Sequence, residues 1–150
     1  MTEKWSEYMQ ERFRNVEENL AEIRQKIAGA ARASGRKPED IILLAATKTV
    51  PVEVVNHAIE LGVTHVGENR VQELEKKYDR LERERCSVHF IGHLQTNKVK
   101  NLVGRVDMIE SEDSVRLAKE ISRISMQHNV TTDILLEVNI GREESKSGVL

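Results

Sequence analysis

The chain has 150 residues, of which 32% are charged and 39% are hydrophobic, and its formal net charge is -2. This length suits one soluble globular domain, and the small net charge excludes a general electrostatic attraction to nucleic acid or anionic membranes. A single cysteine, Cys86, excludes a disulfide framework, while short apolar runs and a polar start at Met1 exclude a membrane span and a signal peptide, so we expect a cytoplasmic protein.

The first segment is predicted to form one long helix over about residues 2–34. Its apolar residues recur in steps of three and four, at Met9, Phe13, Val16, Leu20, Ile23, Ile27 and Ala30. Thr2 or Ser6 is a suitable N-cap, and Ser34-Gly35 is a suitable end. We expect the apolar stripe of this helix to pack onto the rest of the domain.

From Pro38 onward the sequence alternates between strand-like and helix-like stretches. Strands are predicted at residues 41–47, 64–69, 87–92, 106–110 and 133–139. Helices are expected between them, with Pro51 in the first turn of one and Ser111 as the N-cap of the last, whose apolar stripe begins at Val115. Strict alternation of β and α predicts a parallel sheet with right-handed crossovers.

Lys48 follows the first strand-like run. Residues 41–47 are apolar or small without polar alternation, which is typical of a strand buried on both faces. The carboxyl end of such a strand is where α/β barrels build their active sites. A partly desolvated amine there loses its proton more readily and can condense with a carbonyl group to form a Schiff base. This strand alone also fits, and more commonly, a solvated lysine that begins a loop.

Polar residues alternate with apolar ones in the later strands. The sets that share a face are His65, Gly67 and Asn69, then His89, Ile91 and His93, and finally Leu135, Glu137 and Asn139. If the apolar faces meet the helices, these sets point into a barrel. They fit a polar pocket, satisfied internal hydrogen bonds, or strands at an exposed sheet edge. A metal shared by His89 and His93 is excluded, because four residues of strand separate their Cβ atoms by roughly 13 Å.

Four blocks of sequence resemble one known family in their order and spacing. They are Thr47-Lys48-Thr49, then Gly67-Glu68-Asn69-Arg70-Val71-Gln72-Glu73, then His89-Phe90-Ile91-Gly92-His93-Leu94-Gln95-Thr96-Asn97-Lys98, and finally Glu137-Val138-Asn139-Ile140 followed by Lys146-Ser147-Gly148. Together they resemble the pyridoxal-phosphate homeostasis protein family. The resemblance runs from about Lys37 to the end of the chain, and the second and third blocks are its most specific parts.

The resemblance implies an α/β fold, the N-terminal part of a (β/α)8 TIM barrel with parallel strands and a long N-terminal helix, similar to the barrel domain of alanine racemase. It implies pyridoxal 5′-phosphate as the cofactor, bound through a Schiff base to Lys48. Asn69, His93 and Asn139 are the other expected cofactor-binding residues, because each lies near a strand's carboxyl end, whereas Glu68 is expected to face outward. The implied role is non-catalytic, in intracellular vitamin B6 and amino-acid homeostasis, with transfer of the cofactor to pyridoxal-phosphate-dependent enzymes.

Two other functions stay open. One is a pyridoxal-phosphate-dependent racemase or decarboxylase. Racemisation needs an acid/base group on each face of the reacting centre, and Lys48 supplies one of them. The other is a barrel that binds only proteins, in which Lys48 has no chemical part. Sustained turnover would identify the first, and failure to bind pyridoxal phosphate would identify the second.

The length of the chain bears on its domain organisation. A (β/α)8 barrel takes about 250 residues. We therefore expect residues 1–150 to be the N-terminal portion of a larger protein, with the helix at about 2–34, βα units at about 41–150, and the phosphate-binding loops of the family beyond Leu150. A five-stranded part of a barrel exposes a sheet edge and apolar surface, which predicts self-association of this chain.

Overall fold

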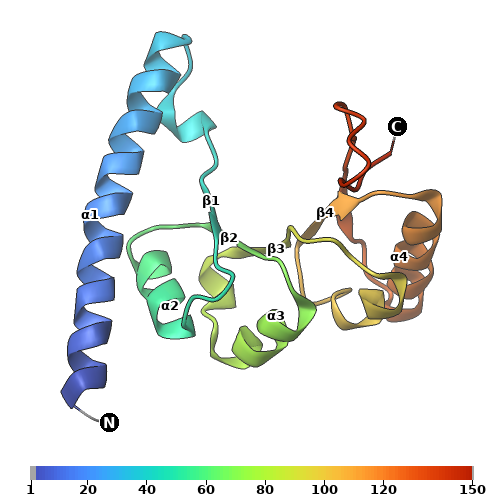
Figure 1. Ribbon diagram of the computed structural model, residues 1–150, viewed down its shortest axis with the longest axis horizontal. Helices are drawn as coiled ribbons and strands as arrows, with labels where there is room; N and C mark the ends of the chain where they lie inside the picture. The colour runs from blue at the N-terminus through green and yellow to red at the C-terminus, as the bar shows by residue number, and fades with distance from the viewer. Residues whose placement is uncertain (1–2, 150) are drawn as a thin grey trace.

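The computed structural model describes residues 3–149, which form an α/β fold with one parallel sheet and a long helix beside it (Figure 1). The strands are β1 Leu44–Ala46, β2 His65–Glu68, β3 Ser87–Phe90, β4 Met108–Glu112 and β5 Asp133–Leu136. The α-helices are α1 Glu3–Ala33, α2 Val52–Glu60, α3 Val71–Lys77 and α4 Val115–His128. Within this range the five strands form one sheet in the order β1-β2-β3-β4-β5, with every neighbouring pair parallel. The predicted α/β class and parallel order are confirmed.

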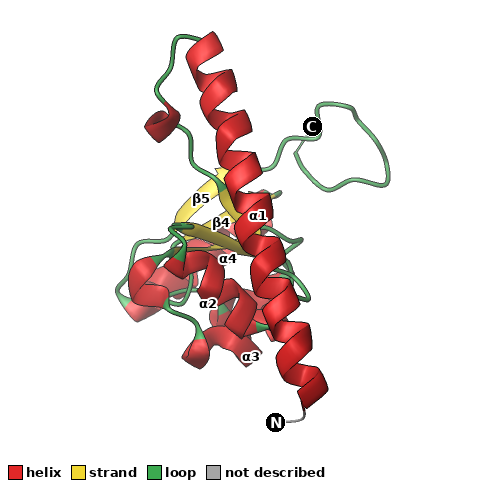
Figure 2. Ribbon diagram, turned by 90° about the vertical axis from the view of Figure 1, so that its left-hand side faces the viewer, coloured by secondary structure: helices red, strands yellow, loops and turns green. Residues whose placement is uncertain are grey.

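Helix α1 ends as its sequence predicts and packs beside α2 (Figure 2). Gly35, just past its last turn, adopts φ 73°, a conformation that glycine reaches without steric cost. The Phe13 ring stacks on His57 of α2 with a centroid separation of 4.5 Å, and Met9 and Leu20 are buried. Ser6 lies inside the helix and is therefore not its cap, while Thr2 lies outside the described residues.

The hydrophobic core lies between the sheet and helices α2, α3 and α4, which cover one face of it (Figure 1). Val66 of β2, Phe90 of β3 and Ile109 of β4 pack there with Leu74 of α3 and Leu117 of α4. The opposite face carries the polar residues of the alternating strands. The sequence therefore assigned the two faces correctly, because side chains alternate along a strand.

Several element boundaries differ from the sequence-based expectation. Of the helices expected between the strands, the one after β2 is α3 followed by a short 3-10 helix at Tyr78–Arg80, and the one after β3 is only the 3-10 helix Thr96–Asn101. The predicted strand at 41–47 shortens to β1, because pairing with β2 begins only at Leu44, and residues 41–43 connect it irregularly to the 3-10 turn at Pro38–Asp40. None of the helices within residues 3–149 has both the length and the apolar composition needed to cross a bilayer.

The N-cap of α4 is Ser114 and not Ser111. Strand β4 continues through a bulge as far as Glu112, so Ser111 belongs to the strand. Ser114 Oγ accepts a hydrogen bond from the Leu117 amide at 3.3 Å, and the Ser114 amide donates to Glu112 at 3.0 Å. The buried face of α4 begins at Leu117, and Val115 is 72% exposed. Because the helix begins after Ser114, its buried face starts at Leu117 and not at Val115, as the sequence predicted.

Candidate functional site

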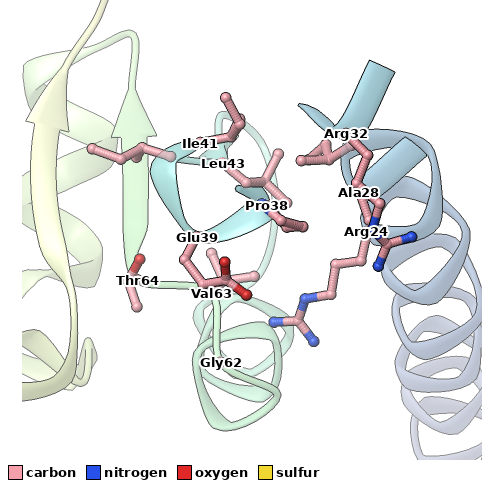
Figure 3. Close-up of a pocket in the computed structure, with 12 residues that line it drawn as sticks. Arg24, Ala28, Arg32, Pro38, Glu39, Ile41, Leu43, Gly62, Val63 and Thr64 are labelled. Atoms are coloured by element: carbon pink, nitrogen blue, oxygen red, sulfur yellow. The ribbon is translucent and has the colours of Figure 1, made fainter. Parts of the chain in front are cut away.

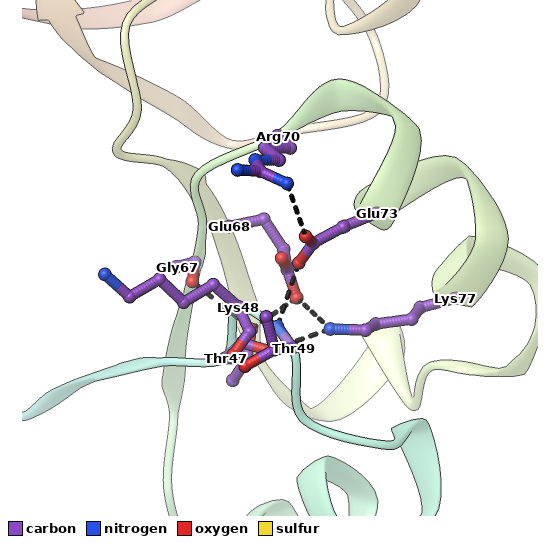
Figure 4. Close-up of polar contacts among 8 residues, drawn as sticks. All are labelled: Thr47, Lys48, Thr49, Gly67, Glu68, Arg70, Glu73 and Lys77. Carbon is purple, nitrogen blue, oxygen red and sulfur yellow. Dashed lines mark hydrogen bonds and ion pairs between the residues drawn. The ribbon is translucent and has the colours of Figure 1, made fainter.

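Lys48 lies in a turn at the carboxyl end of β1, where the sequence placed it. The Thr47 amide still donates to the Gly67 carbonyl of β2 at 2.9 Å, and the chain leaves the sheet after this bond. Lys48 is exposed, and its side chain has no hydrogen bond or ion pair to any residue within 3–149. In Figure 4 its amine points away from the polar cluster formed by Thr47, Glu68 and Lys77. The turn therefore presents an unpaired primary amine.

A buried ion pair lies directly beside this turn. Glu68 Oε1 is 2.6 Å from Lys77 Nζ and accepts a hydrogen bond from the Thr47 hydroxyl at 2.7 Å. Lys77 Nζ also donates to the Thr47 carbonyl at 2.8 Å. Glu68 is 2% exposed, because it faces the helix layer and Lys77 comes to it from α3. Its outward direction was predicted from the sequence, whereas the role of Lys77 was missed.

Asn69 directly follows β2 at the end of the sheet where the turn with Lys48 follows β1, since Ala46 pairs with Gly67 in the sheet register. Its Oδ1 is buried and has no hydrogen-bond partner in the described part of the chain. Gly92, which follows β3, is tight against it, because a Cβ atom there would come within 2.1 Å of the Asn69 carbonyl oxygen. An unsatisfied buried amide oxygen is costly and marks a position where a ligand donor would fit.

His93 and Asn139 lie at the ends of β3 and β5, and other loops already contact them. His93 Nδ1 is 3.3 Å from Asp113 Oδ2 and 3.3 Å from Ser147 Oγ. The Asn139 amide nitrogen donates to the Glu143 carbonyl at 2.9 Å, and its oxygen accepts from the Glu143 amide at 3.1 Å. The Asn139 side chain therefore stabilises the loop to which it belongs. His93 connects the segment after β3 to the loops after β4 and β5.

The polar residues on the open face of the sheet form a second cluster, nearer the strands' amino ends. His89 is buried, with Nε2 2.9 Å from Ser87 Oγ and Nδ1 2.6 Å from Glu110 Oε1. The His65 ring meets the His89 ring edge-on at 5.3 Å. These residues line a hollow of about 460 Å³. Both interpretations of the alternating pattern therefore hold in part, because an open hollow exists and His89 within it is satisfied by internal hydrogen bonds.

A larger hollow of about 670 Å³ lies between α1 and the segments that precede β1 and β2 (Figure 3). Arg24 and Arg32 of α1 line one side, and Glu39 lies across from them. Arg24 Nη2 donates to the Leu61 carbonyl at 2.8 Å, which fastens α1 to the end of α2. This hollow is at the amino ends of the strands and so lies at the opposite end of the sheet from Lys48.

The sequence is similar to curated proteins of one name. A pyridoxal phosphate homeostasis protein from Aquifex aeolicus is 45% identical over 135 residues, which cover 90% of this chain and 59% of that protein. The protein of the same name from Escherichia coli K12 is 36% identical over 138 residues, again covering 90% of this chain and 59% of the relative. The chain therefore spans about three fifths of the length of these relatives. No model of a protein family matches it.

The fold is similar to solved structures as well. A crystal structure of an unknown protein from Bifidobacterium adolescentis has a TM-score of 0.87 and 39% identity, with 93% of this chain and 60% of that one covered. PipY of Synechococcus elongatus, solved with PLP bound, has a TM-score of 0.69 and 31% identity, with 83% and 58% covered. In sequence, this chain is thus similar to about three fifths of proteins named pyridoxal phosphate homeostasis protein, and in fold it is similar to a solved structure with PLP bound.

Proposed function

We propose that the protein binds pyridoxal 5′-phosphate through Lys48 and serves pyridoxal phosphate and amino-acid homeostasis in the cell without turning over a substrate. The observation that carries this proposal is the Lys48 amine, which has no partner among residues 3–149 and follows β1 at the same end of the sheet at which Asn69, with its unsatisfied oxygen, follows β2. The names of the curated relatives and the PLP-bound structure of PipY support it. Transfer of the cofactor to pyridoxal-phosphate-dependent enzymes is part of the proposal.

The chemistry asked of Lys48 is a reversible condensation. Pyridoxal phosphate supplies an aldehyde, to whose carbon a neutral lysine amine adds, and water leaves as a carbon–nitrogen double bond forms. Two lysines lie at this end of β1. Lys77 Nζ is engaged by Glu68 and by the Thr47 carbonyl, whereas Lys48 has no such partner among residues 3–149. Lys48 is therefore the amine that is available for the reaction.

Asn69 is the second proposed cofactor-binding residue. Its buried Oδ1 accepts no hydrogen bond within the described residues, so it suits a donor such as the 3-hydroxyl of the cofactor ring. Such a bond would satisfy the oxygen and would orient the ring relative to Lys48. Because a carboxamide oxygen that gains a buried partner contributes about 1 kcal/mol, Asn69→Ala should weaken binding about fivefold to tenfold.

His93 and Asn139 remain proposed contacts at the rim of the site. Each lies after a strand's carboxyl end, and His93 is bonded through Nδ1 to the loops that carry Asp113 and Ser147. Its other ring nitrogen, Nε2, has no bond to a described residue and is available to a ligand. Asn139 would act by holding residues 139–146 in place, because its amide is already used there.

The test is to titrate the complete protein with pyridoxal phosphate, reduce it with borohydride, and map the labelled peptide. We expect the visible Schiff-base absorbance band and a label on Lys48. Lys48→Ala should remove both, while Lys98→Ala, a lysine in the 3-10 helix after β3, should remove neither. A label on another lysine would overturn the assignment. Sustained racemase or decarboxylase turnover by the complete protein would replace the non-catalytic role by the enzymatic one.

We also propose that residues 1–150 are one partial alanine-racemase-like barrel and that this chain self-associates. Strand β5 is the last strand of the sheet, and Ile134, Leu135 and Leu136 on it are exposed. An exposed apolar edge strand is a template for pairing with another chain. Sedimentation should show a concentration-dependent oligomer, which Leu136→Lys should weaken. A chain that stays monomeric at all concentrations would contradict this proposal.

A further inference from the structure

The turn that carries Lys48 is held at both ends by side chains, while Lys48 itself is left unbound. At its first residue, the Thr47 hydroxyl donates to Glu68 Oε1 at 2.7 Å and the Thr47 carbonyl accepts from Lys77 Nζ at 2.8 Å. At its last residue, the Thr49 amide donates to Glu73 Oε2 at 2.9 Å. Figure 4 shows these bonds converging on the turn from β2 and α3, with the Lys48 side chain directed away from them.

The backbone of this turn is not one that its sequence adopts by default. Thr49 has φ 62°, in the left-handed region. A β-branched residue there is a steric outlier, and such a conformation is strained, so its surroundings must offset the strain. The bond from the Thr49 amide to the Glu73 carboxylate is available to offset this strain. The direction in which Lys48 leaves the sheet is therefore imposed by its neighbours.

The Glu68–Lys77 ion pair at the first end of the turn carries a desolvation cost. Glu68 is 2% exposed and the Lys77 side chain 13% exposed, so both charges lose most of their hydration. Glu68 Oε2 is, in addition, buried without a hydrogen-bond partner among the described residues. A buried pair of this kind often stabilises a fold no better than apolar residues of the same volume. What it adds here is orientation, because its hydrogen bonds fix the Thr47 hydroxyl and carbonyl.

We propose that Glu68, Lys77 and Glu73 are positioning residues for Lys48. They fix the backbone on either side of it, so that its side chain leaves the strand end in a set direction and its amine stays unpaired among the described residues. The inference rests on the proposed function of Lys48. It also assigns different roles to the two lysines at this strand end. Lys77 holds the turn as an ion-paired donor, and Lys48 alone reacts with the aldehyde.

Glu73 is the best place to test this, because it is partly exposed in the first turn of α3 and its loss leaves the core intact. Glu73→Ala should raise the hydrogen-exchange rate of the Thr49 amide at least tenfold in the protein without cofactor. It should lower both the rate and the equilibrium constant of pyridoxal phosphate attachment at Lys48 about tenfold, the value of one charge-assisted hydrogen bond. Glu73→Gln keeps an acceptor oxygen and should restore both within about threefold.

Glu75→Ala is the matched control, because Glu75 is an exposed glutamate of the same helix that accepts from Asn101 instead of the turn. It should change neither the Thr49 exchange rate nor attachment at Lys48. Glu68→Gln keeps the shape of the side chain but removes its charge, and it should lower attachment at Lys48 by tenfold or more. Circular dichroism identifies whether this variant folds, and the Glu73 series decides the question if it does not.

The outcomes separate this inference from the proposed function. Borohydride labelling of the unmodified protein tests the function, and a label elsewhere than Lys48 would overturn the function and the positioning role together. If Lys48 is labelled but Glu73→Ala leaves Thr49 exchange and attachment unchanged, the positioning role is wrong and the function stands. Loss of attachment in Glu73→Ala with rescue in Glu73→Gln is the result we expect.

Discussion

The central strand β3 and the last strand β5 both carry large apolar side chains, but these side chains have very different surroundings. Phe90 of β3 is 1% exposed, because the neighbouring strands flank it and the helices cover it. Leu136 of β5 is 62% exposed, although Ile134, Leu135 and Leu136 form as apolar a run as any in the chain. An apolar run thus shows which residues gain by burial, and other segments decide whether they are buried.

The same contrast applies to the polar groups at the carboxyl ends of the strands. Around β1 and β2, Thr47, Glu68 and Lys77 are bonded to one another and are mostly buried. After β5, Asn139 is bonded only within its own exposed loop. The buried groups around β1 and β2 are therefore the part of the molecule whose geometry supports an argument about chemistry.

The largest effect that distinguishes the two regions is the loss of a core side chain. Phe90→Ala should lower the free energy of unfolding by about 3–5 kcal/mol, because it removes buried apolar area and leaves a cavity. At a concentration low enough for the chain to be monomeric, Leu136→Ala should lower it by less than about 1 kcal/mol, because this side chain is then mostly in water. Urea unfolding followed by circular dichroism measures both. Equal losses would show that β5 is covered in solution.

A glycine pair provides the next test. A Cβ atom on Gly92, beside β3, would lie 2.1 Å from the Asn69 backbone oxygen, so Gly92→Ala forces two strand ends apart. We expect it to cost about 2–3 kcal/mol, the upper part of the range for overpacking, and to weaken pyridoxal phosphate binding through Asn69. Gly141→Ala, in the loop after β5, meets only the Glu143 side chain at 3.4 Å.

Gly141→Ala should therefore leave the free energy of unfolding unchanged within about 0.5 kcal/mol. The two variants are compared by urea unfolding and by titration with pyridoxal phosphate. If Gly92→Ala binds and unfolds like the unmodified protein, the end of β2 is looser than the structure indicates, and Asn69 would lose its support as a fixed contact.

The sequence predicted the parts of this fold that depend on local pattern. The alternation of strands and helices, the two faces of the sheet, and the position of Lys48 after β1 all follow from periodicity and chain order. It misplaced the α4 cap, because Ser111 and Ser114 are equally suitable by residue type, and only the bulge in β4 decides between them. The first predicted strand was too long, because apolar residues such as Ile42 lie in the irregular segment between the 3-10 turn and β1.

The candidate site was predicted only in part for the same reason. Lys48 and Asn69 were identified from their strand ends, but Lys77 and Glu73 were not. On a helical pattern both are ordinary charged residues of an exposed face. Their contacts with Thr47 and Thr49 span 30 and 24 residues of sequence, so they depend on how α3 packs against the turn. No local signal encodes such a contact.

The smallest expected effect concerns the reactivity of a thiol. Cys86 lies just before β3 and is partly buried. Burial, and then the nearby carboxylates of Asp107 and Glu82, raises the pKa of Cys86 above its ordinary value. Because the thiolate is the reactive form, Cys86 should be alkylated by iodoacetamide severalfold more slowly near neutral pH than an exposed cysteine. Leu136→Cys in a Cys86→Ser background supplies that exposed cysteine on β5.

The raised pKa of Cys86 also makes the free energy of unfolding depend on pH. In the unfolded chain the thiol loses its proton at the ordinary pKa, before the folded protein does. Its contribution to the free energy of unfolding is therefore complete below that pH, and it is lost as pH rises towards the raised pKa. Stability measured from neutral to alkaline pH should fall more steeply for the unmodified protein than for Cys86→Ser. Equal slopes, or alkylation of Cys86 as fast as that of the cysteine on β5, would show that the start of β3 is as open to solvent as the edge of the sheet.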